Sequence, residues 1–165
     1  MKKDTVYTGA AFPRAYKDIL GETIPEMLES DANIIYLDAD LMSCIGTKKY
    51  AAAHPDRAIN CGIAEANAAG LAAAGFKPII HTFGPFASRR CYDQIFMSGG
   101  YAHNDITVIG SDPGVCAAFN GGTHMPFEDV ALYRAIPTAT VIDVTDGNLL
   151  KNVLPKLPYL SGIKY

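Results

Sequence analysis

The chain has 165 residues, 49% of them hydrophobic and 19% charged, a composition typical of one globular domain. Its net charge of −3 excludes the basic excess of a nucleic-acid-binding protein, and no polybasic run favours a membrane surface. Because no run of about 18 apolar residues occurs, we expect no transmembrane helix. No apolar stretch follows Lys2-Lys3, so the pattern also predicts no secretory signal.

Helical segments alternate with short apolar runs along the chain. In order, the pattern predicts a helix over 13–30 (in two pieces or kinked at Pro25), a strand over 34–37, a helix over 47–53, a strand over 58–61, a helix over 64–74, a strand over 78–82, a helix over 86–101, a strand over 106–109, a helix over 126–135, a strand over 140–144 and a helix over 147–154. Strands separated by helices indicate an α/β fold, a three-layer sandwich around a mainly parallel sheet of five or six strands. Residues 1–155 then form one domain, and 156–165, which has no clear element, begins a linker.

Ligands of such sheets bind at the carboxyl ends of the strands. Four predicted strands end in polar or turn residues, namely Asp38-Ala39-Asp40, Cys61-Gly62, Thr82-Phe83-Gly84 and Gly110-Ser111-Asp112. We therefore expect the chemistry of this chain at these four ends.

Glu65 is the only charged residue between Arg57 and Lys77. A lone carboxylate among small apolar residues at a helix start indicates a buried group, and buried carboxylates are candidates for function. Alternatively, Glu65 is a first-turn residue that the helix dipole favours. The pattern alone leaves both interpretations open.

The small residues of the 64–74 helix allow another backbone to approach closely. They fit either a subunit interface or tight helix–sheet packing within one subunit. Phe83 and Phe86, three residues apart at a strand end, either line a slot for a flat ring or belong to the core. In the glycine-rich segment 120–126, His124 lies near a helix start, where it is placed to face a ligand.

The cysteines and histidines form no metal motif. They are scattered as Cys44, Cys61, Cys91, Cys116, His54, His81, His103 and His124. Without a Cys-x-x-Cys pair, four reduced thiols in a cytoplasmic protein and no metal site are expected.

Several motifs occur in a fixed order. They are Pro55-Asp56-Arg57, Asn60-Cys61-Gly62-Ile63-Ala64-Glu65-Ala66-Asn67, Thr82-Phe83-x-x-Phe86, Tyr92-Asp93-Gln94, Gly122-Thr123-His124 and Glu128-Asp129-Val130-Ala131-Leu132-x-Arg134-x-Ile136-Pro137. Together, over 16–146, they resemble the pyrimidine-binding domain of the transketolase family of thiamine-diphosphate enzymes. The resemblance is nearest to the carboxy-terminal subunit of two-component transketolases, with deoxyxylulose-phosphate synthase a near relative.

The resemblance implies a role for each candidate residue. Glu65 matches the catalytic glutamate that hydrogen-bonds N1′ of the aminopyrimidine and holds a proton there. Phe86 matches the residue that stacks on the pyrimidine, with Phe83 beside it. The remaining matches are Asp40 near the thiazolium ring, Arg90 near the cofactor and His124 facing the reacting substrate.

Two departures fall in the implied substrate channel. Asp112 stands where two-component transketolases have a histidine, and Asn120 lies where they have an acidic stretch. A third departure is a helix one turn shorter after Glu65. The first two bear on sugar-phosphate specificity rather than on the cofactor.

The resemblance also implies partners. The Gly-Asp-Gly motif that binds the diphosphate and Mg²⁺ is absent from this chain and belongs to another domain of the family. We therefore expect a homodimer, inactive alone, that joins a diphosphate-binding subunit to transfer a two-carbon ketol unit between sugar phosphates. The alternatives are a deoxyxylulose-phosphate-synthase-like or oxo-acid-dehydrogenase-like enzyme, or a non-catalytic assembly domain of the same fold.

Overall fold

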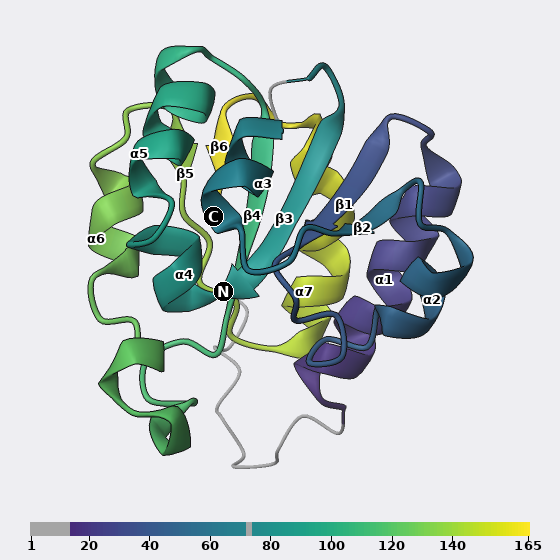
Figure 1. Cartoon of the computed structure of the whole chain (residues 1–165), viewed down its shortest axis with the longest axis horizontal. Coiled ribbons are helices and arrows are strands. Elements are labelled where there is room, and N and C mark those ends of the chain that lie inside the picture. Colours follow the sequence, from purple (N-terminus) through teal and green to yellow (C-terminus); the bar gives the residue numbers. More distant parts are fainter. Residues whose placement is uncertain (1–13, 72–73) are drawn as a thin grey trace, which may run out of the picture.

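A parallel sheet organises the chain. The computed structural model describes residues 14–71 and 74–165, so the expected helix start at Pro13 and the end of the 64–74 helix lie partly outside the described residues (Figure 1). The six strands follow the order β2-β1-β3-β4-β6-β5, and every pair is parallel. They are β1 (Ile34–Asp38), β2 (Ala58–Asn60), β3 (Lys77–Phe83), β4 (Ile106–Ser111), β5 (Ala139–Thr140) and β6 (Ile163–Lys164). The predicted α/β class is thereby confirmed.

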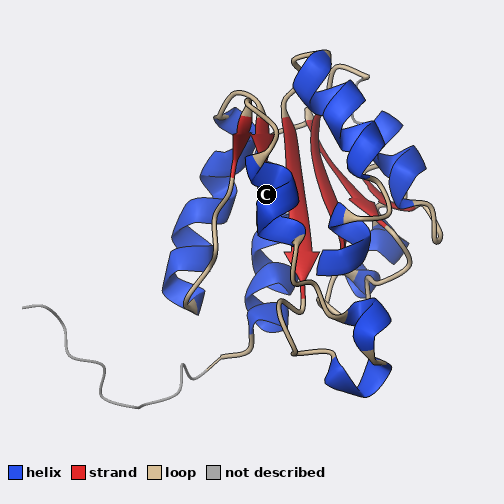
Figure 2. Cartoon of the chain, turned by 90° about the vertical axis from the view of Figure 1, so that its left-hand side faces the viewer, coloured by secondary structure: helices blue, strands red, loops and turns tan. Residues whose placement is uncertain are grey.

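Helices cover both faces of the sheet, as Figure 2 shows. They are α1 (Tyr16–Ser30), α2 (Lys48–Ala53), α3 (Glu65–Leu71), α4 (Gly84–Ser88), α5 (Tyr92–Ile95), the π-helix η1 (Phe96–Tyr101), α6 (Asp129–Arg134) and α7 (Gly147–Val153). Short 3₁₀ turns complete the set, namely η2 (Ala118–Asn120), η3 (Gly122–His124) and η4 (Leu154–Tyr159). α1 is one continuous helix through Pro25.

The core lies in two layers because successive side chains of a strand point to opposite faces. In β3, Ile79 packs with the layer under α1 and α7, and Ile80 packs with the layer under α3, α4, α5 and α6. The five residues between the ends of β3 are all buried, as expected for a central parallel strand.

The prediction of a single helix over 86–101 is wrong. Gly84-Pro85 opens α4 earlier than expected, a break follows Ser88, and the last part winds as the π-helix η1. A Cβ at Gly99 would come within 2.8 Å of the Ile163 side chain. The wider π-turn and the bare glycine therefore let this segment approach β6.

The tail is a strand, not the start of a linker as expected over 156–165. β6 inserts between β4 and β5, Ile163 is fully buried, and the Tyr165 ring stacks on Tyr133 at 3.9 Å (Figure 1). Lys164 is buried too, and its Nζ donates to the carbonyl oxygens of Leu160 and Gly162. Two paired residues, one of them a lysine, give too short a pattern for a strand prediction.

The other elements differ from expectation mainly at their ends. The strand expected over 140–144 pairs only through Ala139–Thr140, and the helix expected over 126–135 begins at Asp129.

Candidate active site

Glu65 begins α3 at the carboxyl end of the sheet. Gly62 adopts a left-handed φ of 69°, which turns the chain out of β2 just before the helix. Ala68 and Ala69 are fully buried, so their small side chains bring α3 close onto the sheet of the same chain. This agrees with tight packing within one subunit. The exposed Gly70, around which a Cβ would meet nothing within 4 Å, leaves the outer side of α3 open to a second surface.

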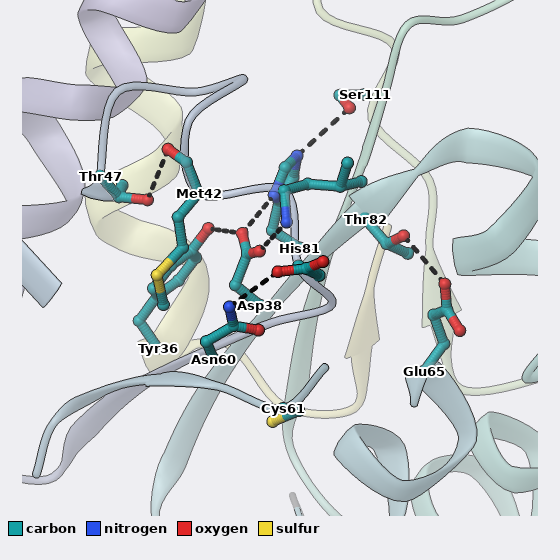
Figure 3. Close-up of polar contacts among 12 residues, drawn as sticks. Tyr36, Asp38, Met42, Thr47, Asn60, Cys61, Glu65, His81, Thr82 and Ser111 are labelled. Carbon is teal, nitrogen blue, oxygen red and sulfur yellow. Dashed lines mark hydrogen bonds and ion pairs between the residues drawn. The ribbon is translucent and has the colours of Figure 1, made fainter. Parts of the chain in front are cut away.

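Glu65 is 2% exposed, and only one of its two carboxylate oxygens has hydrogen-bond partners among the described residues. Its Oε1 accepts hydrogen bonds from Arg90 at 2.8 Å and from the Thr82 hydroxyl at 3.3 Å, the latter drawn in Figure 3. Its Oε2 is buried without a partner among the described residues. Burial, and then the charge of Glu65, raise the pKa of the neighbouring Cys91 thiol to about 12. An orphaned carboxylate oxygen is costly unless a donor arrives from outside the chain.

Aromatic rings lie beside this carboxylate. His124 contacts Phe83 and Phe86 edge-on, with ring centroids 5.5 and 4.9 Å apart, and the two phenylalanines are 6.1 Å apart. The Arg90 guanidinium lies 3.8 Å above the Phe86 ring while it binds Glu65. Phe83, Phe86 and His124 are all partly exposed. Arg90 therefore links Glu65 to the aromatic rings. We call Glu65, Arg90, Phe83, Phe86 and His124 the Glu65 cluster.

Three other predicted residues lie outside the Glu65 cluster. Asp40, exposed after β1, has a left-handed φ of 66° and accepts a hydrogen bond of 2.9 Å from Asn60. Asp112, after β4, has a left-handed φ of 55°. Asn120 is exposed in η2. The structure gives none of the three a contact with Glu65.

A polar network that sequence reasoning missed lies behind the loops of Asp40 and Asp112. Figure 3 shows Tyr36, Asp38, His81 and Ser111 connected across β1, β3 and β4. The sequence contained part of this information, because Asp38 and Ser111 belong to two of the polar strand ends and His81 precedes Thr82. Their partnership depends on the strand register, which pairs Asp38 with His81 and Phe83 with Ser111 and which the residues alone do not give.

Within residues 14–71 and 74–165, no group of three or more His, Cys, Asp or Glu side chains is placed to hold a metal ion. No helix in these ranges has the length and apolarity needed to cross a bilayer.

The fold and the Glu65 cluster define an α/β domain with a buried acid beside aromatic rings at the carboxyl edge of a parallel sheet. Residues 13–157 match the family model described as "Transketolase, pyrimidine binding domain". The chain belongs to this family, as its motifs indicated.

Individual relatives agree. The chain is 43% identical over 153 residues to the 6-deoxy-6-sulfo-D-fructose transketolase subunit SqwH of Clostridium sp. (strain MSTE9), covering 90% of this chain and 48% of that protein. It is 32% identical over 154 residues to the 1-deoxy-D-xylulose-5-phosphate synthase of Desulfitobacterium hafniense (strain Y51), covering 91% and 24%.

A solved structure, "Split gene transketolase, inactive beta4 tetramer", is 30% identical with a TM-score of 0.78, covering 92% of this chain and 49% of that one. The chain thus spans about half the length of the nearer of these relatives and about a quarter of the synthase.

Proposed function

We propose that this chain is the pyrimidine-binding part of a two-component, thiamine-diphosphate-dependent transketolase. The observation that carries the proposal is the Glu65 carboxylate, buried at the edge of the sheet. Its Oε2 has no partner among the described residues, and Arg90 links its Oε1 to the ring of Phe86. Membership of the transketolase pyrimidine-binding family supports it.

The residues present fit the aminopyrimidine ring. Oε2 of Glu65 needs a hydrogen-bond donor, and a protonated ring nitrogen is one. Phe83 and Phe86 offer partly exposed apolar surface at the same place, which suits a flat heteroaromatic ring. Because Arg90 occupies one face of Phe86, the ring would stack on the other face or displace the guanidinium.

When bound, thiamine diphosphate supplies the nucleophilic carbon and the electron sink for cleaving a ketose. Glu65 would hold a proton at N1′, and Thr82 and Arg90 fix its Oε1 so that Oε2 is the free oxygen. His124, partly exposed and in edge contact with the aromatic rings, would donate a hydrogen bond to the reacting sugar or accept one from it. Asp40 would stand near the thiazolium ring.

The substrates are proposed to be sugars with an anionic end group, which the similarity to the 6-deoxy-6-sulfo-D-fructose transketolase subunit favours. Asp112 and Asn120 would line the channel. A carboxylate at position 112 repels a phosphate dianion more than a sulfonate monoanion. We therefore expect weaker use of phosphorylated sugars than in transketolases with histidine there.

The partner is proposed to be a subunit that binds the diphosphate and Mg²⁺, together with a second copy of this chain. Ile63, Phe119 and Phe127 expose 75%, 107% and 72% of their surface, which supports a covering partner. The outer side of α3 is our candidate for the homodimer contact. All four cysteines are free, which supports a cytoplasmic location.

The test is reconstitution with the diphosphate-binding subunit of the same organism, followed by assay against ketose phosphates and 6-deoxy-6-sulfofructose. Two-carbon transfer to an aldose supports the proposal. Condensation of pyruvate with an aldose phosphate would instead favour the synthase-like alternative. Failure of the pair to bind thiamine diphosphate would favour a non-catalytic assembly domain.

A further inference from the structure

A buried polar row crosses three strands on the face of the sheet opposite Glu65. Thr82 contacts Glu65, so the preceding residue of β3, His81, points to the other face. Asp38 and His81 are both fully buried, with Nδ1 of His81 2.8 Å from Oδ2 of Asp38. Nε2 of His81 lies 3.2 Å from Oγ of Ser111, the last residue of β4 (Figure 3).

This row has the composition of a Ser-His-Asp nucleophilic triad, but its burial is wrong for one. The His81 ring has no exposed surface, so it has no route to a leaving group. Asp38 also accepts hydrogen bonds from the Tyr36 hydroxyl and the Leu41 backbone N–H. Because the Asp38 carboxylate is the acceptor in these hydrogen bonds, we assign it the acceptor role toward His81 as well. Nδ1 of His81 then carries the proton and donates to Asp38.

The row ties together two loops that carry candidate site residues. The bond from Leu41 N–H to Asp38 closes the turn in which Asp40 takes its left-handed conformation. Ser111 immediately precedes Asp112, which is also left-handed. His81 is therefore the side-chain link between the loop of Asp40 and the loop of Asp112.

We propose that His81 is a positioning residue for these two loops. Because Nδ1–H donates to Asp38, Nε2 is the acceptor side of the ring, and it holds the Ser111 hydroxyl beside Asp112 by accepting its hydrogen bond. This rests on the proposed function, because it places Ser111 at the sugar channel.

The first experiment measures kcat and KM for the ketose in the reconstituted holoenzyme. Ser111→Ala removes the hydroxyl, and His81→Asn keeps a donor toward Asp38 while losing Nε2. Both should raise KM about tenfold, as for one lost hydrogen bond, with kcat little changed. Ser111→Ala should change thiamine diphosphate affinity by no more than about twofold, since Glu65 lies on the other face. The surface variant Ser161→Ala is the control. A Ser111→Ala enzyme with the wild-type KM would overturn the proposal.

The second experiment needs no activity. Imidazole ¹⁵N spectra of the full chain should show His81 with Nδ1 protonated and Nε2 accepting a hydrogen bond. Ser111→Ala should shift the Nε2 resonance. A ring protonated at Nε2, or an Nε2 resonance unchanged by Ser111→Ala, contradicts the proposal. If the wild-type pair shows no ketol transfer, the proposed function fails, while these spectra still decide the direction of the Ser111 bond.

Discussion

Replacing Glu65 by glutamine changes one group of the site and little else. The amide retains an oxygen for Arg90 and Thr82 but puts an NH₂ group where Oε2 now lacks a partner. Because the Arg90 side chain is 42% exposed, loss of its ion pair should cost the fold about 1 kcal/mol or less. Losing the charge-assisted bond to N1′ should cost about 1.5–3 kcal/mol, or roughly 10- to 150-fold in cofactor affinity.

Turnover of the Glu65→Gln enzyme should fall further, by roughly 100-fold or more, because a proton-holding group is lost. The assay is exchange of the C2 proton of thiamine diphosphate, followed by NMR in the reconstituted pair at saturating cofactor. Saturation should restore occupancy but not exchange, whereas Glu26→Gln on the exposed side of α1 should behave as wild type. If Glu65→Gln exchanges as fast as wild type, Glu65 is only a helix-start residue and the reasoning fails.

Three further predictions concern specificity, metal and thiols. Asp112→His should lower KM for a phosphorylated substrate in steady-state assays of the reconstituted pair, because it removes a negative charge from the channel; unchanged kinetic constants would place Asp112 outside it. Calorimetric titration of the chain alone with Mg²⁺ should show weak surface binding only, and a stoichiometric micromolar site would contradict the assignment of the metal to the partner. With its pKa raised to about 12, the buried Cys91 thiol stays protonated at pH 8, so Ellman's reagent should modify the exposed Cys116 first; equal rates would contradict the buried position.

One more prediction concerns the assembly of the chain. The chain should form a dimer through the outer side of α3, and light scattering that finds a monomer at every workable concentration would refute it.

The sequence predicted the fold class and the centre of the candidate site for identifiable physical reasons. Glu65 stood out because a lone charged residue among small apolar residues indicates a buried group, and it is 2% exposed. The order of the motifs led to the family, and the apolar runs led to β1, β2, β3 and β4, with the fifth predicted strand meeting β5 only at Thr140. Each of these signals is local in the chain.

What escaped prediction depends on contacts between distant segments. β6 is a strand because it pairs with β4 and β5, while Ile163 packs against Gly99, and the pattern of the tail contains none of these neighbours. His81 meets Asp38 and Ser111 only through the register of three strands. The pairing of Arg90 with Glu65 likewise follows from how α3 and α5 pack, since the two residues are 25 positions apart.

Binding of thiamine diphosphate to the chain, to the diphosphate-binding subunit and to their mixture tests the central claim most directly. Calorimetry with Mg²⁺ present should show tight, stoichiometric binding to the mixture, and weakened binding when the mixture contains Glu65→Gln. Binding by the diphosphate-binding subunit alone that is equally tight, with no change when this chain is added, would contradict the claim that the pyrimidine site lies on this chain.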